Sequence, residues 1–271
     1  MPPAMMMVAT VAAESMVAFT LILLALQLAA YCVGYVLGRR RNIARCRKNV
    51  GIIVGGMLGL LGFVLALTLS FANGRFAERR AGALAEANAI DTAWLRAQAI
   101  DHPRGPEIAQ LLEDYIKLRH EFVVVGVDPV RIDGLNRQTN ALQSQIWARM
   151  AAIVHDRTDP VAAALMTSLN EVFDMGMATR FAFEVQLPPQ VFWLLIGMTT
   201  LSMFALGYQL GLKRTPLPLL TLGLILMWTF VIVDILDLAA PRIGRFRVAP
   251  AAYDWTMQGF GPMPALPPLK P

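Results

Sequence analysis

The chain has 271 residues, of which 56% are hydrophobic and 16% charged, whereas soluble domains average about 25% charged. Its two cysteines exclude a disulfide framework, and its three scattered histidines lack zinc-site spacing, so we expect no metal or other cofactor. The net charge of +5 does not indicate nucleic acid, because six of the 24 basic residues crowd one short loop between apolar segments.

Four apolar segments are long enough to cross a bilayer, which requires about 20 helical residues. They cover residues 16–38, 50–72, 191–212 and 217–238. Lipid cannot satisfy an exposed backbone, so each segment is expected to be a helix. Residues 1–15 lack the positively charged start of a secretory signal, so we expect the first span to be retained.

The stretch between the second and third spans, residues 73–190, shows no alternating strand pattern. It predicts helices over residues 75–98, 106–125, 132–156 and 160–184, the first continuing span two and the last opening with the cap Asp159-Pro160. The tail, residues 239–271, is rich in Pro and Gly and is expected to be extended or disordered. We therefore predict an all-α, multi-pass membrane protein with four transmembrane helices in two pairs and an inserted extramembrane helical bundle.

The distribution of basic residues predicts the topology. Loop 39–49 contains six basic residues and no acid, and Lys213 and Arg214 follow the third span. The positive-inside rule places both loops in the cytoplasm of a bacterial inner membrane, with the central domain and both termini in the periplasm. Opposing this, basic residues also follow the second and fourth spans, at Arg75, Arg79, Arg80, Arg242, Arg245 and Arg247.

Glycines recur along the second span. Gly51, Gly55 and Gly59 are four residues apart and share a helix face, and Gly62 follows them. Glycine on such a face lets a second helix approach closely. Two interpretations remain open: helix packing, within or between subunits, and a pore-lining helix.

Charged residues lie at the ends of the second and fourth spans, which meet on one side of the membrane. A carboxylate near hydrocarbon is costly unless it is paired. We therefore hypothesise ion pairs between Asp234 or Asp237 and Arg75 or Arg79, with Glu86 near the same helix face as the arginines. The alternative is that both aspartates reach interfacial water.

Polar residues follow on the same predicted helix. Asn88, Asp91 and Thr92 are spaced to form a cluster, which could line an ion vestibule or bridge helices through hydrogen bonds. Charged positions further on, Glu113, Asp114, Lys117, Arg119 and Glu121, are expected on a solvated face. The sequence has no phosphate loop, zinc-protease motif, nucleophile elbow or dinucleotide fingerprint, so an enzyme is not favoured.

The run from Gly59 to Arg80, followed by Glu86-Ala-Asn-Ala-Ile-Asp-Thr-Ala-Trp-Leu-Arg-Ala, resembles the bacterial bestrophin-like membrane family, and the likeness extends from about Gly38 to Gly244. That family usually closes with Asp-x-Asp-Arg-Pro-x-x-Gly. Here the match is Asp234-Ile-Leu-Asp237-Leu-Ala-Ala-Pro241-Arg-Ile-Gly244, with altered spacing and the arginine displaced to Arg242. The resemblance implies two span pairs around a central helical region. Bestrophins proper are pentameric ion channels with a pore lined by the second span, and their central region is cytoplasmic, opposite to the charge-based orientation.

Two functions follow as hypotheses. The first is a homo-oligomeric ion channel in the lipid bilayer, with span two lining or packing around the axis. The second is a non-conducting membrane sensor or scaffold whose central helices bind a partner. A transporter usually has several buried polar groups at mid-membrane, but only Gln27 is polar near the middle of a span.

Overall fold

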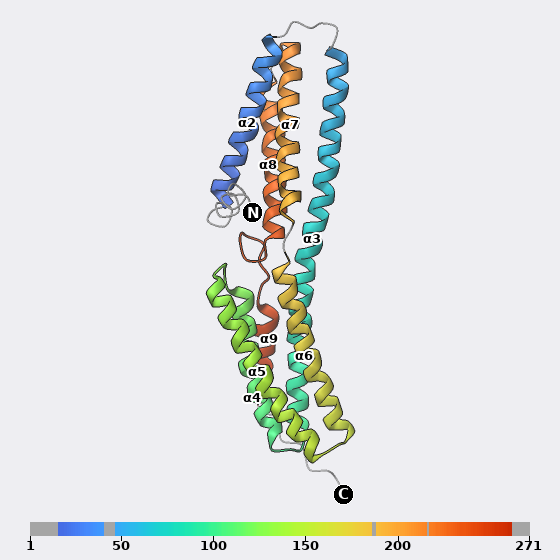
Figure 1. The fold of residues 1–271 in the computed structure, drawn as a ribbon, viewed down its shortest axis with the longest axis vertical. Coiled ribbons are helices and arrows are strands. Elements are labelled where there is room, and N and C mark those ends of the chain that lie inside the picture. Colours follow the sequence, from blue (N-terminus) through green and yellow to red (C-terminus); the bar gives the residue numbers. More distant parts are fainter. Residues whose placement is uncertain (1–15, 41–46, 186–187, 216, 262–271) are drawn as a thin grey trace. The chain divides into compact units, whose positions relative to one another are not determined.

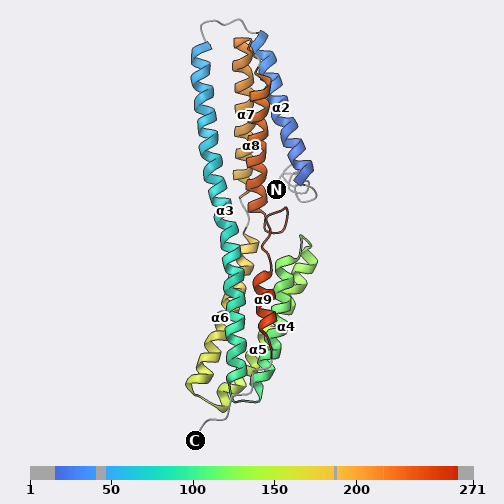
Figure 2. The same cartoon turned by 180° about the vertical axis from the view of Figure 1, so that it is seen from behind.

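A computed structural model describes residues 16–40, 47–185, 188–215 and 217–261, which form helices and no strand, as the sequence predicts. The chain folds into two compact units. The membrane unit is Met1–Phe76 with Gln186–Phe246, and the helical unit is Ala77–Val185 with Arg247–Pro271. The helices, labelled in Figures 1 and 2, are α2 (Met16–Arg40), α3 (Arg47–Ala99), α4 (Arg104–Val124), α5 (Pro129–Asp156), α6 (Pro160–Glu184), α7 (Pro189–Lys213), α8 (Pro218–Ala239) and α9 (Ala251–Gly259). Helix α3 contributes to both units.

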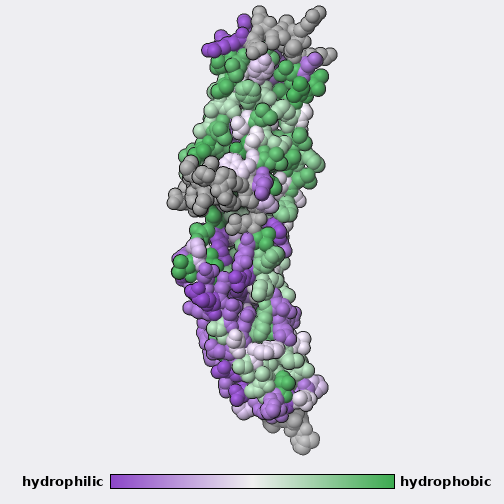
Figure 3. Space-filling model, viewed as in Figure 1, coloured by the Kyte–Doolittle hydropathy of each residue, from purple (hydrophilic) through white to green (hydrophobic). Residues whose placement is uncertain are grey.

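The four predicted spans are confirmed as helices. Helices α2, α3, α7 and α8 are long and apolar enough to cross a membrane, with mean hydropathies of 2.3, 2.5, 1.7 and 2.4 over their most apolar windows. Only 17% to 28% of each window is buried inside the chain. Figure 3 shows the resulting hydrophobic surface over these helices. Most span side chains therefore face lipid or another chain.

Within the membrane unit, α2 and α7 run side by side in the same direction and their backbones touch (Figure 1). At four glycines, a Cβ atom would lie closer than 3.0 Å to a carbonyl oxygen of the other helix: Gly34 against Phe204, Gly38 against Tyr208, Gly207 against Tyr31, and Gly211 against Tyr35. Each helix carries its glycines four residues apart, the small-xxx-small spacing that permits close approach. The glycine spacing of span two predicted close helix packing there. The backbone contact instead joins spans one and three.

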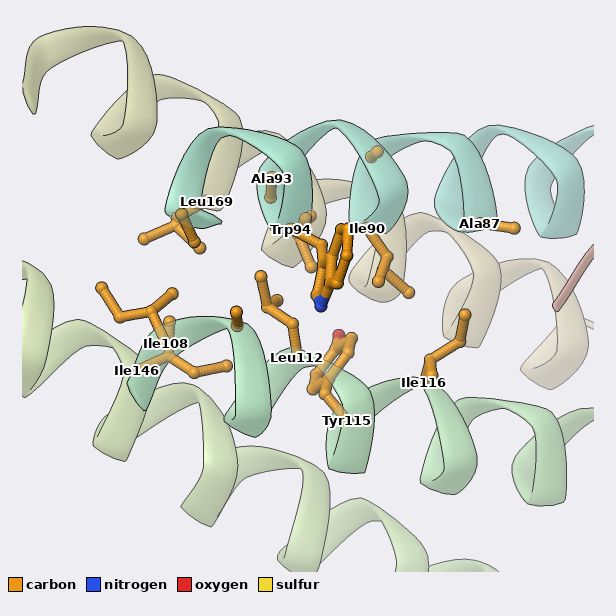
Figure 4. Close-up of a cluster of buried hydrophobic side chains, with 14 of the residues drawn as sticks. Ala87, Ile90, Ala93, Trp94, Ile108, Leu112, Tyr115, Ile116, Ile146 and Leu169 are labelled. Atoms are coloured by element: carbon orange, nitrogen blue, oxygen red, sulfur yellow. The ribbon is translucent and has the colours of Figure 1, made fainter. Parts of the chain in front are cut away.

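The helical unit surrounds an apolar core. In Figure 4, Trp94 of α3 lies near Leu112 and Tyr115 of α4, and Ile146 of α5 and Leu169 of α6 belong to the same buried cluster. These residues recur at helical spacing, so each amphipathic helix buries one face against the others.

Two aspartates begin helices in this unit. Asp128 accepts hydrogen bonds from the N–H groups of Val130 and Arg131, and Asp159 accepts them from Val161 and Ala162. Each is followed by a proline at the first helical position, which has no N–H to leave unsatisfied. The predicted cap at Asp159 is confirmed. The Ala162 N–H and the Arg157 guanidinium hold the pKa of Asp159 below its usual range.

The prediction of an extended tail is wrong for residues 251–259, which form α9. The helix is held by tertiary contacts. Tyr253 is fully buried, Phe260 stacks on Trp94 with ring centroids 4.9 Å apart, and Asp254 lies 3.2 Å from His120. Burial of these side chains overrides the Pro- and Gly-rich local composition, which is only a weak guide to structure.

We predict that Gly207→Ala destabilises the membrane unit. The new methyl group would meet the Tyr31 carbonyl oxygen of α2, and such overpacking costs about 1–3 kcal/mol. That loss corresponds to a fall of roughly 3–10 °C in the unfolding midpoint in detergent. The control is Gly223→Ala on α8, where no heavy atom lies within 4 Å. It should leave the midpoint unchanged or slightly raised, and equal behaviour of the two variants would refute the contact.

Candidate functional site

Much of α3 is exposed in the membrane unit, and one line of exposed residues runs along it without interruption. Its residues recur every three or four positions, the spacing that keeps side chains on one side of a helix. They are Ile52, Gly56, Gly59, Phe63, Ala66, Ser70 and Gly74. In the helical unit the same spacing continues, again exposed, through Ala77, Ala81, Leu84, Asn88, Thr92 and Leu95. We call these thirteen positions the α3 row, and none of them is charged.

The four glycines predicted on span two lie in two different environments. Gly51 faces the side-chain amide of Gln209 on α7, and Gly62 faces the Trp228 ring on α8, with Cβ positions 3.1 and 3.4 Å from those groups. A Cβ on Gly55 or Gly59, by contrast, would meet no atom of another helix within 4 Å. The first pair lies against the chain's own helices, and the second lies on or beside the open α3 row.

The predicted polar cluster lies at the row in the helical unit. Asn88 and Thr92 are exposed members of the row, and Asp91 is half-buried beside it. Among the described residues, no hydrogen bond joins these three side chains to another helix. Both the vestibule and the bridging hypotheses stay predictions.

At the end of α8, Asp237 organises the chain that leaves the membrane unit. Its carboxylate is 5% exposed and accepts the N–H groups of Arg245, at 2.9 and 3.1 Å, and of Phe246, at 3.3 Å. Gly244 makes this turn possible, because its φ is +86° and any Cβ would overlap the Asp237 carboxylate. Phe246 then packs edge-on against Phe76. Asp237 therefore closes the loop that follows α8.

The other predicted ion-pair residues are Asp234 of α8 and Arg75 and Arg79 of α3. Asp234 is half-buried, one turn before Asp237, and the Arg75 guanidinium lies 5.4 Å from the centre of the Phe71 ring. Arg79 belongs to the helical unit and is 1% exposed. Pairing of either aspartate with Arg75 or Arg79 stays a prediction.

The helical unit contains a buried charged network centred on Glu86. Its carboxylate forms an ion pair with Arg119 of α4, both side chains being at most 1% exposed. Tyr253 of α9 donates its hydroxyl to the same carboxylate at 2.8 Å. Arg119 also donates to the Gly176 carbonyl of α6 at 3.1 Å. One buried carboxylate thus connects α3, α4, α6 and α9.

Tyr115 of α4 and Gly176 of α6 lie beside this network and contact each other. A Cβ on Gly176 would come closer than 3.0 Å to the Tyr115 hydroxyl, which accepts a hydrogen bond from Gln143 of α5 at 3.2 Å. The Arg119 guanidinium also lies 4.6 Å from the centre of the Phe122 ring. The buried Glu86 carboxylate thus accepts from both Arg119 and Tyr253, as burial of a charge requires.

Burial controls the protonation of the network. It raises the pKa of Tyr115 from 10.0 to about 12, with a further contribution from the Glu86 charge. The same two causes, in the same order, raise the pKa of Tyr253. Burial alone would lower the pKa of Arg119, but the Glu86 carboxylate outweighs it and raises that pKa. Both tyrosines stay neutral and Arg119 stays charged at physiological pH.

The roles of Arg119 and Tyr253 in this network were not predicted from the sequence. The prediction that Arg119 lies on a solvated face is wrong, because Glu86 supplies a buried partner that local periodicity does not reveal. Tyr253 was missed because it lies in the Pro- and Gly-rich tail. The available signal was the apolar spacing around Arg119, with Tyr115, Ile116, Phe122 and Val123 on the buried side of α4. Among the described residues, no group of three or more His, Cys, Asp or Glu side chains is placed to hold a metal ion.

Comparison with known proteins identifies the fold. No protein-family model and no curated sequence matches the chain. A variant of a bacterial bestrophin homologue from Klebsiella pneumoniae matches with a TM-score of 0.65 at 14% identity, over 90% of this chain and 96% of that one. Another structure of a Klebsiella pneumoniae bestrophin homologue gives 0.61 at 15% identity, over 90% and 98%. A further crystal structure, of a membrane protein, gives 0.64 at 13% identity, over 88% and 96%.

The chain has the bestrophin fold. The resemblance predicted from Gly59 to Arg80 and from Glu86 onward is therefore confirmed at the level of structure. In this bestrophin-like chain, the α3 row and Glu86 lie on the same helix, the row exposed and Glu86 buried.

We predict that Tyr253→Phe loosens the helical unit. The change leaves the Glu86 carboxylate buried with one donor fewer, which costs about 1–3 kcal/mol. The midpoint of thermal unfolding in detergent should fall. The control is Tyr208→Phe on α7, whose hydroxyl makes no hydrogen bond among the described residues. If the two variants unfold at the same temperature, Tyr253 does not support the network.

Stability should also depend on alkaline pH. Burial raises the pKa of Tyr115 to about 12 in the folded protein, against an ordinary value of 10.0. The folded state therefore retains a proton that the unfolded state loses, and stability falls as pH rises from 10 to 12. The difference corresponds to about 3 kcal/mol. Unfolding in urea between pH 8 and 12 measures it, and Tyr115→Phe should show a shallower decline above pH 10. An unchanged slope in that variant would exclude Tyr115 as a cause.

Proposed function

We propose that this bestrophin-like membrane protein is a homo-oligomeric ion channel, pentameric by analogy, in which the α3 row lines the central axis. The observation that carries the proposal is the open glycine face of α3. Helices α2 and α7 use their glycines for backbone contact inside the chain, whereas Gly55, Gly56 and Gly59 contact nothing within 4 Å.

Those open glycines need a compensating contact. A glycine inside a helix costs about 0.8–1 kcal/mol relative to alanine, so three cost roughly 2.5–3 kcal/mol. In lipid, small residues are favoured where another helix approaches closely. No helix of the described chain does so here, which supports a second copy as the neighbour of α3.

The composition of the α3 row suits an ion pathway with a hydrophobic constriction. Ile52 and Phe63 are 69% and 61% exposed, and they are the large apolar side chains of the row within the span. Ser70, Asn88 and Thr92 are small and polar beyond them. Without a ring of charge on the row, conduction depends on whether ions can cross the apolar section, and Asn73 and the arginines after the span are further polar groups near its end.

The orientation is part of the proposal. Helices α2 and α7 are parallel and both end in basic residues, so the two basic loops lie on one side of the bundle. We place that side in the cytoplasm of a bacterial inner membrane, with the helical unit in the periplasm. Reporter fusions at the two chain ends test this, and activity typical of the cytoplasm at either end would reverse it.

The alternative, a non-conducting scaffold, is favoured by an exposed apolar patch on α6. Met177 and Phe181 are one turn apart and 64% and 62% exposed. Such a patch outside the spans can receive a partner. A second copy would cover it equally well.

The channel is tested with purified protein, by sizing in detergent and by current in planar bilayers. We expect an oligomer and a current, and we expect Gly59→Leu to reduce the current at least tenfold by crowding the axis or disrupting assembly. The matched control is Gly223→Leu on α8, another exposed glycine in open space, which should conduct normally. A monomer without current in the unmodified chain would remove the channel and favour the scaffold.

A further inference from the structure

The end of the membrane unit where α2 and α7 finish is strongly basic. Arg39 and Arg40 form the last turn of α2, Lys213 lies in the last turn of α7, and Arg214 caps α7. All four side chains are exposed. Figure 3 shows hydrophilic surface at this end, next to the hydrophobic surface of the spans. We propose that these four cations form a binding site for the phosphodiester headgroup of an anionic phospholipid.

The site is held together by the glycine contact between the two helices. A Cβ on Gly211 would lie 2.9 Å from the backbone nitrogen of Arg39, so the two helix ends touch at this point. Arg214, in the left-handed conformation with φ of 54°, donates its N–H to the Gly211 carbonyl at 3.2 Å. The four cationic residues therefore lie within about one helical turn of one backbone contact. The backbone contact therefore brings the attachment points of the four side chains together without a ligand.

The positive charge at this end is not balanced within the described residues. No described carboxylate pairs with these four side chains, and the described acids of the membrane unit, Asp234 and Asp237, lie at the other end of α8. Each helix C-terminus contributes about half a negative charge. Two of them offset about one of four positive charges. An anion would relieve the remaining repulsion.

The surroundings indicate a headgroup rather than a free anion. Tyr35 and Tyr208 lie one turn or more before the cations, and each stacks on a second aromatic ring of its own helix, Tyr31 and Phe204 respectively. Tyrosines at this position mark the depth of the membrane interface. Guanidinium groups match phosphate oxygens in pairs. An acyl chain can then lie along the exposed apolar surface of α2, at Val33, Val36 and Leu37.

The test is lipid binding to the purified full-length chain in detergent micelles, where membrane orientation has no effect. Native mass spectrometry measures the affinity for phosphatidylglycerol and for phosphatidylcholine. We expect phosphatidylglycerol to bind more tightly. Each cation contributes about fivefold near an anionic surface, so Arg39→Gln/Lys213→Gln should weaken its binding about thirtyfold.

The matched control removes two exposed cations from the helical unit, Arg104→Gln/Arg137→Gln, with the same change in net charge. It should bind phosphatidylglycerol normally. If the first variant does not fold, Arg40→Gln/Arg214→Gln removes cations further from the backbone contact. Equal affinity for the two lipids, or equal losses in the site and control variants, would overturn the proposal. Full displacement by inorganic phosphate at matched concentration would assign a free anion instead.

Discussion

The inability of lipid to satisfy a polar backbone is the constraint on which this structure depends. It makes every span a helix, and it removes the hydrophobic driving force between spans, since lipid is as apolar as leucine. Close packing must then hold the membrane unit together. The chain meets this requirement at one place by removing side chains, so that the backbones of α2 and α7 touch at Gly34, Gly38, Gly207 and Gly211.

The helical unit is stabilised in a different way from the membrane unit. It can bury apolar surface from water, and residues such as Ile90, Leu112 and Ile146 fill its core. The Glu86–Arg119 pair is the exception, because two charges are desolvated there. A buried ion pair adds little net stability over an apolar core of the same volume, but removing one partner is costly. In the observed arrangement of α3, α4, α6 and α9 both charges are satisfied, so an arrangement that separated them would leave a buried charge unpaired.

The sequence was sufficient for the parts of the fold that depend on local pattern. Hydropathy located the spans, and Asp159-Pro160 located the start of α6, because both signals act within a few residues. The contacts that needed long-range information were missed. From local sequence, Arg119 is expected on the surface, because nothing near it in the sequence shows that Glu86 lies opposite. Tyr253 is expected in an extended tail, because its packing against α3 and α4 depends on distant residues. The glycines of α2 and α7 are 169 or more positions apart, so their partnership has no local signature.

Each unit uses its buried acids for its own structure. Glu86 pairs with Arg119 and accepts a hydrogen bond from Tyr253. Asp237 accepts hydrogen bonds from the backbone amides of Arg245 and Phe246. These buried acids therefore serve the chain's own structure. The α3 row is left without charge. In the proposed channel, an ion passing the row would meet small or apolar side chains and would be selected by the ease of losing its water, whereas the strong fixed charges lie at the basic ends of α2 and α7, where they face headgroups.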